Sequence, residues 1–279
     1  MTERLRGVIA ITFAALAWST AGLFIKWLDF DAFTILCVRA FYTMMVFLLV
    51  FRGKVFALTW PVVRVAFFYA ALVITFVTST KMTTAANAIF LQYTGVAYVL
   101  LLEPLLFRLP YQRINIITTV VCFAGMALFF MDGLDIQGAG IGLLIAALSG
   151  LAYAGFVLGQ RFNAHTHHEA AIFWGNFLVF FIGMPSFLDA PTFTVNDHLM
   201  LAFLGVIQLG LGYVLFTYGL KRTTATEASL ITMLEPLFNP VWVAIGYGEL
   251  PGISAVIGGL IILAALSIRV LLLRRMRRL

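Results

Sequence analysis

Two ionisable side chains lie within long apolar stretches of the sequence, Arg39 in residues 31–51 and Glu235 in residues 223–247. A charge held inside a membrane-spanning helix is costly, so by default it marks a functional site. The helical rise places both side chains about 12 Å below the same membrane surface. We expect one polar network that includes both, either as a direct ion pair or as separate contacts with the two charged ends of a zwitterionic substrate. A purely structural ion pair is the alternative.

Several uncharged polar and aromatic side chains share these stretches and are candidates for lining a substrate pathway. Gln92 and Gln208 are the strongest, because each lies about 14–16 Å below the same surface by helical rise. The alternative for each is an interhelical hydrogen bond, worth under about 2 kcal/mol in a membrane. The uncharged polar set also includes Asn87, Tyr93, Asn176 and Tyr213. The remaining candidates are Trp18, Tyr153 and Trp174, for which helix packing is the alternative.

Pro236 and Pro240 predict an interruption in the same stretch as Glu235. Proline has no backbone N–H and clashes with the carbonyl four residues earlier, so Pro236 should free the carbonyl of Thr232. Freed backbone groups at membrane depth must be satisfied by protein or by water. The two prolines are therefore a candidate hinge for alternating access, or else a static bend that improves packing.

These side chains need elements that cross a membrane to position them. The 279 residues are 62% hydrophobic and 11% charged, with a mean hydropathy of +1.03, whereas about a quarter of a soluble domain is charged. One crossing takes roughly 20 apolar residues. We therefore expect an all-α, polytopic membrane protein with ten spanning helices, near 5–28, 31–51, 62–81, 83–107, 113–131, 138–161, 169–188, 197–220, 223–247 and 252–273.

The basic residues predict the orientation of the chain. Lysine and arginine concentrate in cytoplasmic loops, and one side of the predicted bundle keeps only Lys26 and Lys81 in its loops. This places both termini in the cytoplasm, with the chain in a bacterial-type inner membrane. The net charge of +6 does not indicate nucleic acid, because the arginines flank apolar runs. The basic tail from Arg274 to Arg278 is expected to contact anionic lipid headgroups.

An internal repeat divides the chain into residues 1–132 and 133–279. The stretch from Phe76 to Ala88 resembles that from Phe216 to Ala228, and both contain Thr-Thr-Ala. A weaker similarity relates the first and sixth apolar runs. Because five crossings are an odd number, the second copy must enter the membrane from the opposite side. Inverted repeats of this kind are typical of secondary transporters, which hold substrate near the midplane between the halves.

These motifs, with the Trp18 region, Arg39-Ala-Phe, Leu234-Glu235-Pro236 and Tyr-Gly-Glu-Leu at 247–250, resemble the drug/metabolite transporter superfamily. The closest resemblance is to its ten-span EamA-type exporters, and within them to the YddG-type exporters of aromatic amino acids. The resemblance implies two five-helix bundles and a central cavity walled by spans three, four, eight and nine. It also implies export of aromatic or neutral amino acids or related metabolites. Val96 replaces the proline that corresponds to Pro236, which leaves a kink in the fourth span without its expected cause.

The expected partners are a small-molecule substrate and membrane lipids. We expect a monomer that binds no nucleic acid, cofactor or metal. An intramembrane enzyme is a rival reading, because His165, His167, His168 and Glu169 could bind a metal. Their spacing lacks the four-residue repeat of ligands on one helical face, and a solvated loop explains them. The chain has no phosphate-binding loop and no paired catalytic groups at a common depth, so we predict that it is not an enzyme. A passive, channel-like facilitator remains open.

Overall fold

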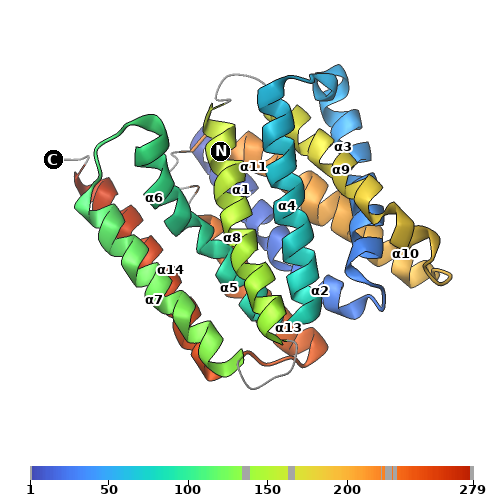
Figure 1. The fold of residues 1–279 in the computed structure, drawn as a ribbon. Coiled ribbons are helices and arrows are strands. Elements are labelled where there is room, and N and C mark those ends of the chain that lie inside the picture. Colours follow the sequence, from blue (N-terminus) through green and yellow to red (C-terminus); the bar gives the residue numbers. More distant parts are fainter. Residues whose placement is uncertain are drawn as a thin grey trace.

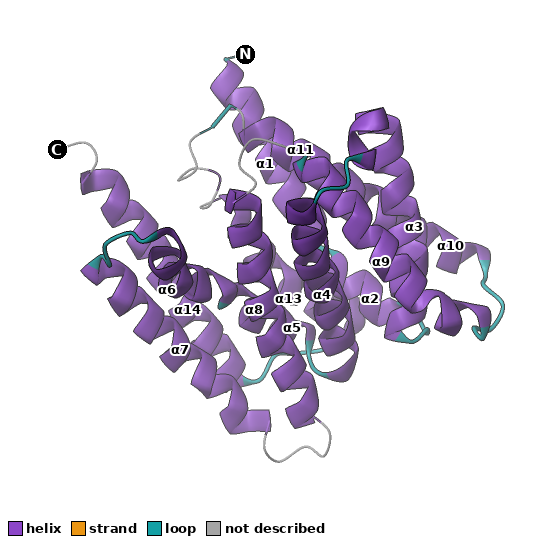
Figure 2. Ribbon diagram, turned by 45° about the horizontal axis from the view of Figure 1, so that its top comes forward, coloured by secondary structure: helices purple, strands orange, loops and turns teal. Residues whose placement is uncertain are grey.

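The computed structural model describes residues 2–133, 139–162, 167–220, 222–223, 228 and 231–276. In these parts of the chain every regular element is a helix (Figure 2). The helices of the first half are α1 (Glu3–Ser19), α2 (Ala21–Trp27), α3 (Ala32–Phe51), the short 3-10 helix η1 (Arg52–Phe56), α4 (Trp60–Met82), α5 (Ala85–Tyr93), α6 (Gly95–Phe107) and α7 (Arg113–Gly133).

The second half is also built of helices. Its helices are α8 (Ala139–Phe162), α9 (His168–Leu188), α10 (Val195–Ala202), the π-helix η2 (Phe203–Leu211), α11 (Gly212–Leu220), α13 (Leu234–Tyr247) and α14 (Ile253–Met276). Within the described residues, eight helical segments are long and apolar enough to cross a membrane. The described part of the fifth predicted span qualifies only over Arg113–Leu128, and α13 has 14 residues. Helices thus occupy all ten predicted spans, but eight meet the length and hydropathy of a crossing.

The two halves interleave rather than lying apart. α4 packs against α8 and α9, α3 packs against α9 and η2, and α1 packs against α11 and α13. Figure 1 shows α7 beside α14 at one edge of the bundle, with α3, α9 and α10 at the other. The contacts of one half have counterparts in the other. In the first half, α1 packs against α11 and α13; in the second half, α8 packs in the same way against α4 and α5.

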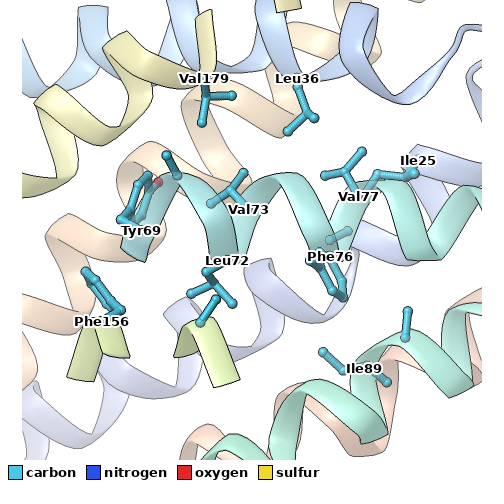
Figure 3. Packing of buried hydrophobic residues seen from close by; sticks show 14 of the residues in the cluster. Ile25, Leu36, Tyr69, Leu72, Val73, Phe76, Val77, Ile89, Phe156 and Val179 are labelled. Atoms are coloured by element: carbon cyan, nitrogen blue, oxygen red, sulfur yellow. The ribbon is translucent and has the colours of Figure 1, made fainter. Parts of the chain in front are cut away.

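α4 lies at the centre of the buried core. Figure 3 shows Val73 of α4 facing Leu36 of α3 and Val179 of α9, while Tyr69 of the same helix lies near Phe156 of α8. Large apolar side chains also cover the outside of the bundle; Leu49, for example, is 79% exposed. A soluble protein rarely exposes so much contiguous apolar surface, so the outer surface fits a lipid environment.

Several predicted spans are interrupted within the bundle. The first breaks at Thr20, whose hydroxyl donates to the carbonyl of Ala17 (2.7 Å), and the fourth breaks at Thr94, whose hydroxyl donates to the carbonyl of Leu91 (2.5 Å). The fourth span therefore bends without the proline that the repeat would have supplied. Gly95 follows the break, and a Cβ there would lie 2.5 Å from the carbonyl oxygen of Gly150. The hydrogen bond of Thr94 to its own helix and the close contact of Gly95 with Gly150 thus accompany the break where the repeat would have had a proline.

Candidate functional site

Arg39 lies on α3 with its side chain directed between the halves. Arg39 is 3% exposed, and its Nη2 donates a hydrogen bond to Oε1 of Gln208 on η2 (2.8 Å). Gly205 allows η2 to approach α3, because a Cβ there would lie 2.7 Å from the carbonyl oxygen of Arg39. The Thr43 hydroxyl is within hydrogen-bond distance of the carbonyls of Arg39 (2.9 Å) and Gly205 (3.0 Å). π-helical turns occur frequently at functional sites, and this one positions Gln208.

Gln208 connects Arg39 to the first helix. Its Nε2 donates to the carbonyl oxygen of Trp18 (3.4 Å), close to the C-terminal end of α1. The Trp18 ring contacts two rings of α11, Tyr213 with centroids 5.1 Å apart and Phe216 at 5.3 Å. Four elements, α1, α3, η2 and α11, therefore meet around Arg39 and Gln208.

Tyr69 of α4 completes this group, although the sequence analysis did not select it. It is fully buried, its ring centroid lies 6.0 Å from that of Tyr213, and its hydroxyl accepts a hydrogen bond from Nδ2 of Asn176 on α9 (3.0 Å). The available signal was a phenol deep within an apolar run, which is the same signal that selected Tyr93 and Tyr213. Its position beside Arg39 depends on the packing of α4 against α9, which the sequence pattern does not specify.

Glu235 lies at the start of α13 in a second polar group. The hydroxyl oxygen of Tyr93 on α5 lies 2.9 Å from Oε2 of Glu235 and 3.0 Å from the carbonyl oxygen of Thr232. Thr232 is four residues before Pro236, so its carbonyl is the one that cannot receive a helical hydrogen bond from residue 236. The ring of Tyr153 on α8 stacks beside that of Tyr93, with centroids 6.5 Å apart. This group joins α5, α8 and α13.

The charges of the two polar groups lie within electrostatic range of each other but form no direct ion pair. Arg39 and Glu235 lie within electrostatic range of each other, yet the salt bridges that the structure describes do not include this pair. Tyr213 lies within electrostatic range of both charges. Glu235, Tyr153 and Tyr213 are only half-buried although helices of both halves surround them. The described side chains of Arg39 and Glu235 thus form no direct ion pair, and separate contacts of the two charges with a zwitterionic substrate stay a prediction.

Several buried polar atoms in this region have no hydrogen-bond partner in the described chain. Those of the predicted site residues are Nε and Nη1 of Arg39, Nε1 of Trp18, Oε1 of Gln92, Oδ1 of Asn176, Nε1 of Trp174 and Oδ1 of Asn87. Most buried polar groups in proteins are satisfied. Arg39 and Trp18 are connected through Gln208, so their unsatisfied donors indicate a place where a polar ligand or water can bind.

The remaining predicted residues, Asn87, Gln92 and Trp174, form no described hydrogen bond or ring contact with Arg39 or Glu235. Asn87 is in the first turn of α5, where its Nδ2 donates to the Thr83 hydroxyl (3.0 Å) and its backbone N–H donates to the Thr84 hydroxyl (3.1 Å). The Thr-Thr-Ala motif at residues 83–85 thus caps a helix; most of its repeat lies outside the described residues. Trp174 packs edge-on against Phe173 and Phe177. Gln92 is buried on α5, next to Tyr93.

The two prolines occupy different positions in α13. The helix begins at Leu234 after a turn at Met233, so Pro236 lies in its first turn, while Pro240 lies within the helix. The chain is therefore interrupted just before Glu235, and this places the carboxylate at a helix start. Of the proposed metal-binding residues, His165 lies outside the described residues. Within those described, no group of three His, Cys, Asp or Glu side chains is arranged to hold a metal ion.

Comparison with known proteins identifies the family. The model of the EamA-like transporter family matches residues 5–131 and 140–271. The chain belongs to the EamA-like transporter family. Membership of this family agrees with the expectation of a multi-pass membrane transporter. One of the two matched segments lies in each half of the chain.

Two relatives that carry the name of a transporter are similar to this chain over most of their length. An uncharacterized transporter of Archaeoglobus fulgidus is 25% identical over 266 residues, covering 94% of this chain and 95% of the relative. One of Clostridium kluyveri is 25% identical over 201 residues, covering 65% and 61%. A crystal structure of another protein superposes with a TM-score of 0.69 at 17% identity, covering 97% of this chain and 98% of that one. At that identity the structural likeness supports the fold alone.

Proposed function

We propose that this EamA-family protein exports amino acids, aromatic or neutral, or closely related metabolites, by alternating access through the polar region between its halves. The observation that carries this proposal is the pair of polar groups centred on Arg39 and Glu235. Each is built by helices of both halves, through the contact of Arg39 with Gln208 and that of Tyr93 with Glu235. A site shared by two halves can open to either side when the halves rock.

The proposed membrane arrangement has ten crossings in two inverted repeats, with both termini in the cytoplasm of a bacterial-type cell. The exchange of packing partners between the halves supports the repeat. α1 begins and α14 ends at the same end of the bundle (Figure 1), which supports an even number of crossings. The distribution of lysine and arginine supports the orientation. In this arrangement α7 and α13 cross with the other eight segments.

The aromatic rings favour the YddG-type substrate range. Trp18, Tyr69, Tyr213 and Phe216 form a continuous set of ring contacts beside Arg39, and Tyr93 stacks with Tyr153 beside Glu235. Rings in such a site can contact the apolar side chain of an amino acid while the charged groups contact its ends. We propose that the interruption at Met233 and Pro236 acts as the hinge, because it lies directly before Glu235.

Counterflow in lipid vesicles tests the proposal. Vesicles containing the full chain and loaded with one unlabelled amino acid should transiently accumulate the same labelled compound, with saturable kinetics. Gln208→Leu and Glu235→Gln should reduce uptake, whereas the exposed substitutions Gln112→Leu and Asp189→Asn should not. Flux that rises linearly with concentration would instead identify a passive facilitator, and equal transport by all variants would contradict the site.

A further inference from the structure

The Arg39 guanidinium has more hydrogen-bond donors than the protein satisfies. Arginine carries five N–H bonds, and the three on Nε and Nη1 have no acceptor in the described chain. Nη2 donates to Gln208, a neutral amide. The side chain is nonetheless buried, at 3% exposure, where water is least able to compensate. Buried charges in proteins are normally paired and fully hydrogen-bonded.

No carboxylate of the described residues pairs with this cation. Glu235 is the acid within electrostatic range, but it forms no salt bridge with Arg39, and its Oε2 is in contact with the Tyr93 hydroxyl. The other titratable groups facing Arg39, Tyr69 on α4 and Tyr213 on α11, are phenols. The surroundings of the guanidinium therefore supply no direct anionic contact.

A second unsatisfied donor belongs to the same hydrogen-bonded group. The indole N–H of Trp18 has no acceptor, and the backbone carbonyl of Trp18 is linked to Arg39 through Gln208. Gly212 of α11 lies directly against this indole nitrogen, and a Cβ at residue 212 would collide with it. The unsatisfied atoms of Arg39 and Trp18 are all donors, so the complementary ligand group is an acceptor with negative charge.

We propose that Arg39, assisted by the indole N–H of Trp18, binds the carboxylate of the transported molecule. This inference rests on the proposed function and specifies the substrate class as small monocarboxylates. A carboxylate has only acceptors, and its planar pair of oxygens matches two parallel N–H bonds of a guanidinium. One cation balances one negative charge, whereas a phosphate dianion would leave excess negative charge facing Glu235. In this proposal the amino group of the substrate contributes less to binding than its carboxylate does.

Binding to the purified full chain in detergent tests this inference. The probes are phenylalanine, leucine and threonine, the corresponding amino acid amides, and 3-phenylpropionate, which has a carboxylate but no amino group. At least one acid should raise the thermal unfolding temperature, its amide should bind at least about tenfold more weakly, and 3-phenylpropionate should retain binding if phenylalanine binds. Stabilisation by none of the acids, equal binding of acid and amide, or an equal effect of sodium chloride would overturn the inference.

Three variants connect this preference to the named atoms. Arg39→Gln should abolish the discrimination between acid and amide, and Arg39→Lys should restore part of it because the positive charge is kept. Trp18→Phe keeps the ring and removes the N–H, and should weaken acid binding by about two- to fivefold; it also serves if Arg39→Gln does not fold. Unchanged discrimination in Trp18→Phe together with Arg39→Lys would overturn the assignment.

The two proposals fail in different ways. If acids bind in preference to amides but vesicles show no counterflow, the transport function fails and the carboxylate site stands. If amino acids are transported but the amides bind equally well, the carboxylate site fails and the transport function stands.

Discussion

Lys26 and Arg39 are both partly or wholly buried cations, yet their surroundings differ completely. Lys26, on α2, has its Nζ 2.6 Å from Oε2 of Glu249 and 2.8 Å from the carbonyl oxygen of Thr83. Glu249 in turn accepts a hydrogen bond from the backbone N–H of Ala85 (2.8 Å). Arg39 has one neutral amide partner and three unsatisfied N–H bonds.

This difference separates a charge that fastens the bundle from one that is available to a ligand. The Lys26 and Glu249 pair ties α2, the start of α5 and the segment after α13 together at one end of the molecule. Two of the three Lys26 N–H donors and both carboxylate oxygens of Glu249 have partners within the protein. The incomplete pairing of Arg39 is therefore not shared by every buried cation in this fold, and it supports the proposed contact of Arg39 with substrate.

The largest expected effect comes from exchanging the two central charges. The double substitution Arg39→Glu with Glu235→Arg preserves net charge and electrostatic attraction, but reverses the positions of the two ends of a zwitterion. We expect a folded protein with export reduced at least about a hundredfold, since each reversed contact costs a charge-assisted hydrogen bond. Size-exclusion chromatography and vesicle counterflow are the measurements. Full recovery of export would instead assign these residues to a structural ion pair.

The fold was more predictable from the sequence than the site was. The ten apolar runs contain the observed helices because burial in lipid imposes a long, uninterrupted apolar pattern. The interruptions at Thr20 and Thr94 were not predicted, since each depends on a side-chain hydrogen bond whose formation is decided by neighbouring helices. The proline after Glu235 was readable because proline acts locally.

The sequence selected most residues of the candidate site but not the contacts between them. Arg39 and Glu235 stood out because charge at membrane depth is costly, and their similar depths placed them in one region. Their separate positions, the π-helix that presents Gln208 and the role of Tyr69 all depend on the packing of α3, α4, η2 and α9. Such contacts join residues far apart in the chain, and no periodic pattern specifies them.

Removing the Tyr93 hydroxyl should have the next largest effect. Tyr93→Phe leaves the carbonyl of Thr232 and the carboxyl of Glu235 without this contact, which should cost about 1–3 kcal/mol of unfolding free energy. Tyr153→Phe is the matched control, because the Tyr153 hydroxyl forms no hydrogen bond with a described residue. Thermal unfolding of the two variants is compared with that of the parent protein. Equal losses would show that the hydroxyl contact contributes nothing specific.

Breaking the Lys26 and Glu249 pair should lower stability less than removing the Tyr93 hydroxyl does. It should change the counterflow rate and leave the preference for acids over amides unchanged. Lys26→Met or Glu249→Gln should each lower stability by about 1 kcal/mol, because the side chains remain 12% and 18% exposed and solvent screens part of the interaction. We expect the acid-to-amide preference to stay unchanged while the counterflow rate changes. A double-mutant cycle measures the coupling between the two side chains. A changed preference would mean that this pair also contacts substrate.

Asp31 provides the smallest predicted effect. It caps α3, where burial opposes its ionisation but hydrogen bonds from the Thr34 hydroxyl and from the backbone N–H groups of Thr34 and Phe33 lower its pKa. Because the folded-state pKa is lowered, this stabilisation is present above the ordinary pKa and is lost as the pH falls through the folded-state value. Asp31→Ala should cost about 1 kcal/mol near neutral pH.

Asp31→Asn is the matched control, since asparagine still caps the helix but does not titrate. Its unfolding temperature should depend less on pH between about 3 and 5 than that of the parent. An identical pH dependence in the two proteins would exclude this contribution from Asp31.

Substrate protection of a cysteine at Tyr213 tests the central claim most directly. Cys37 and Cys122 are buried and free, so both can be replaced by alanine before Tyr213→Cys is introduced within electrostatic range of both charges. In vesicles that still show counterflow, a small thiol reagent should label this cysteine, and the transported amino acid should slow labelling in proportion to occupancy while its amide should not. Labelling that is unaffected by a transported amino acid would contradict a substrate site between Arg39 and Glu235.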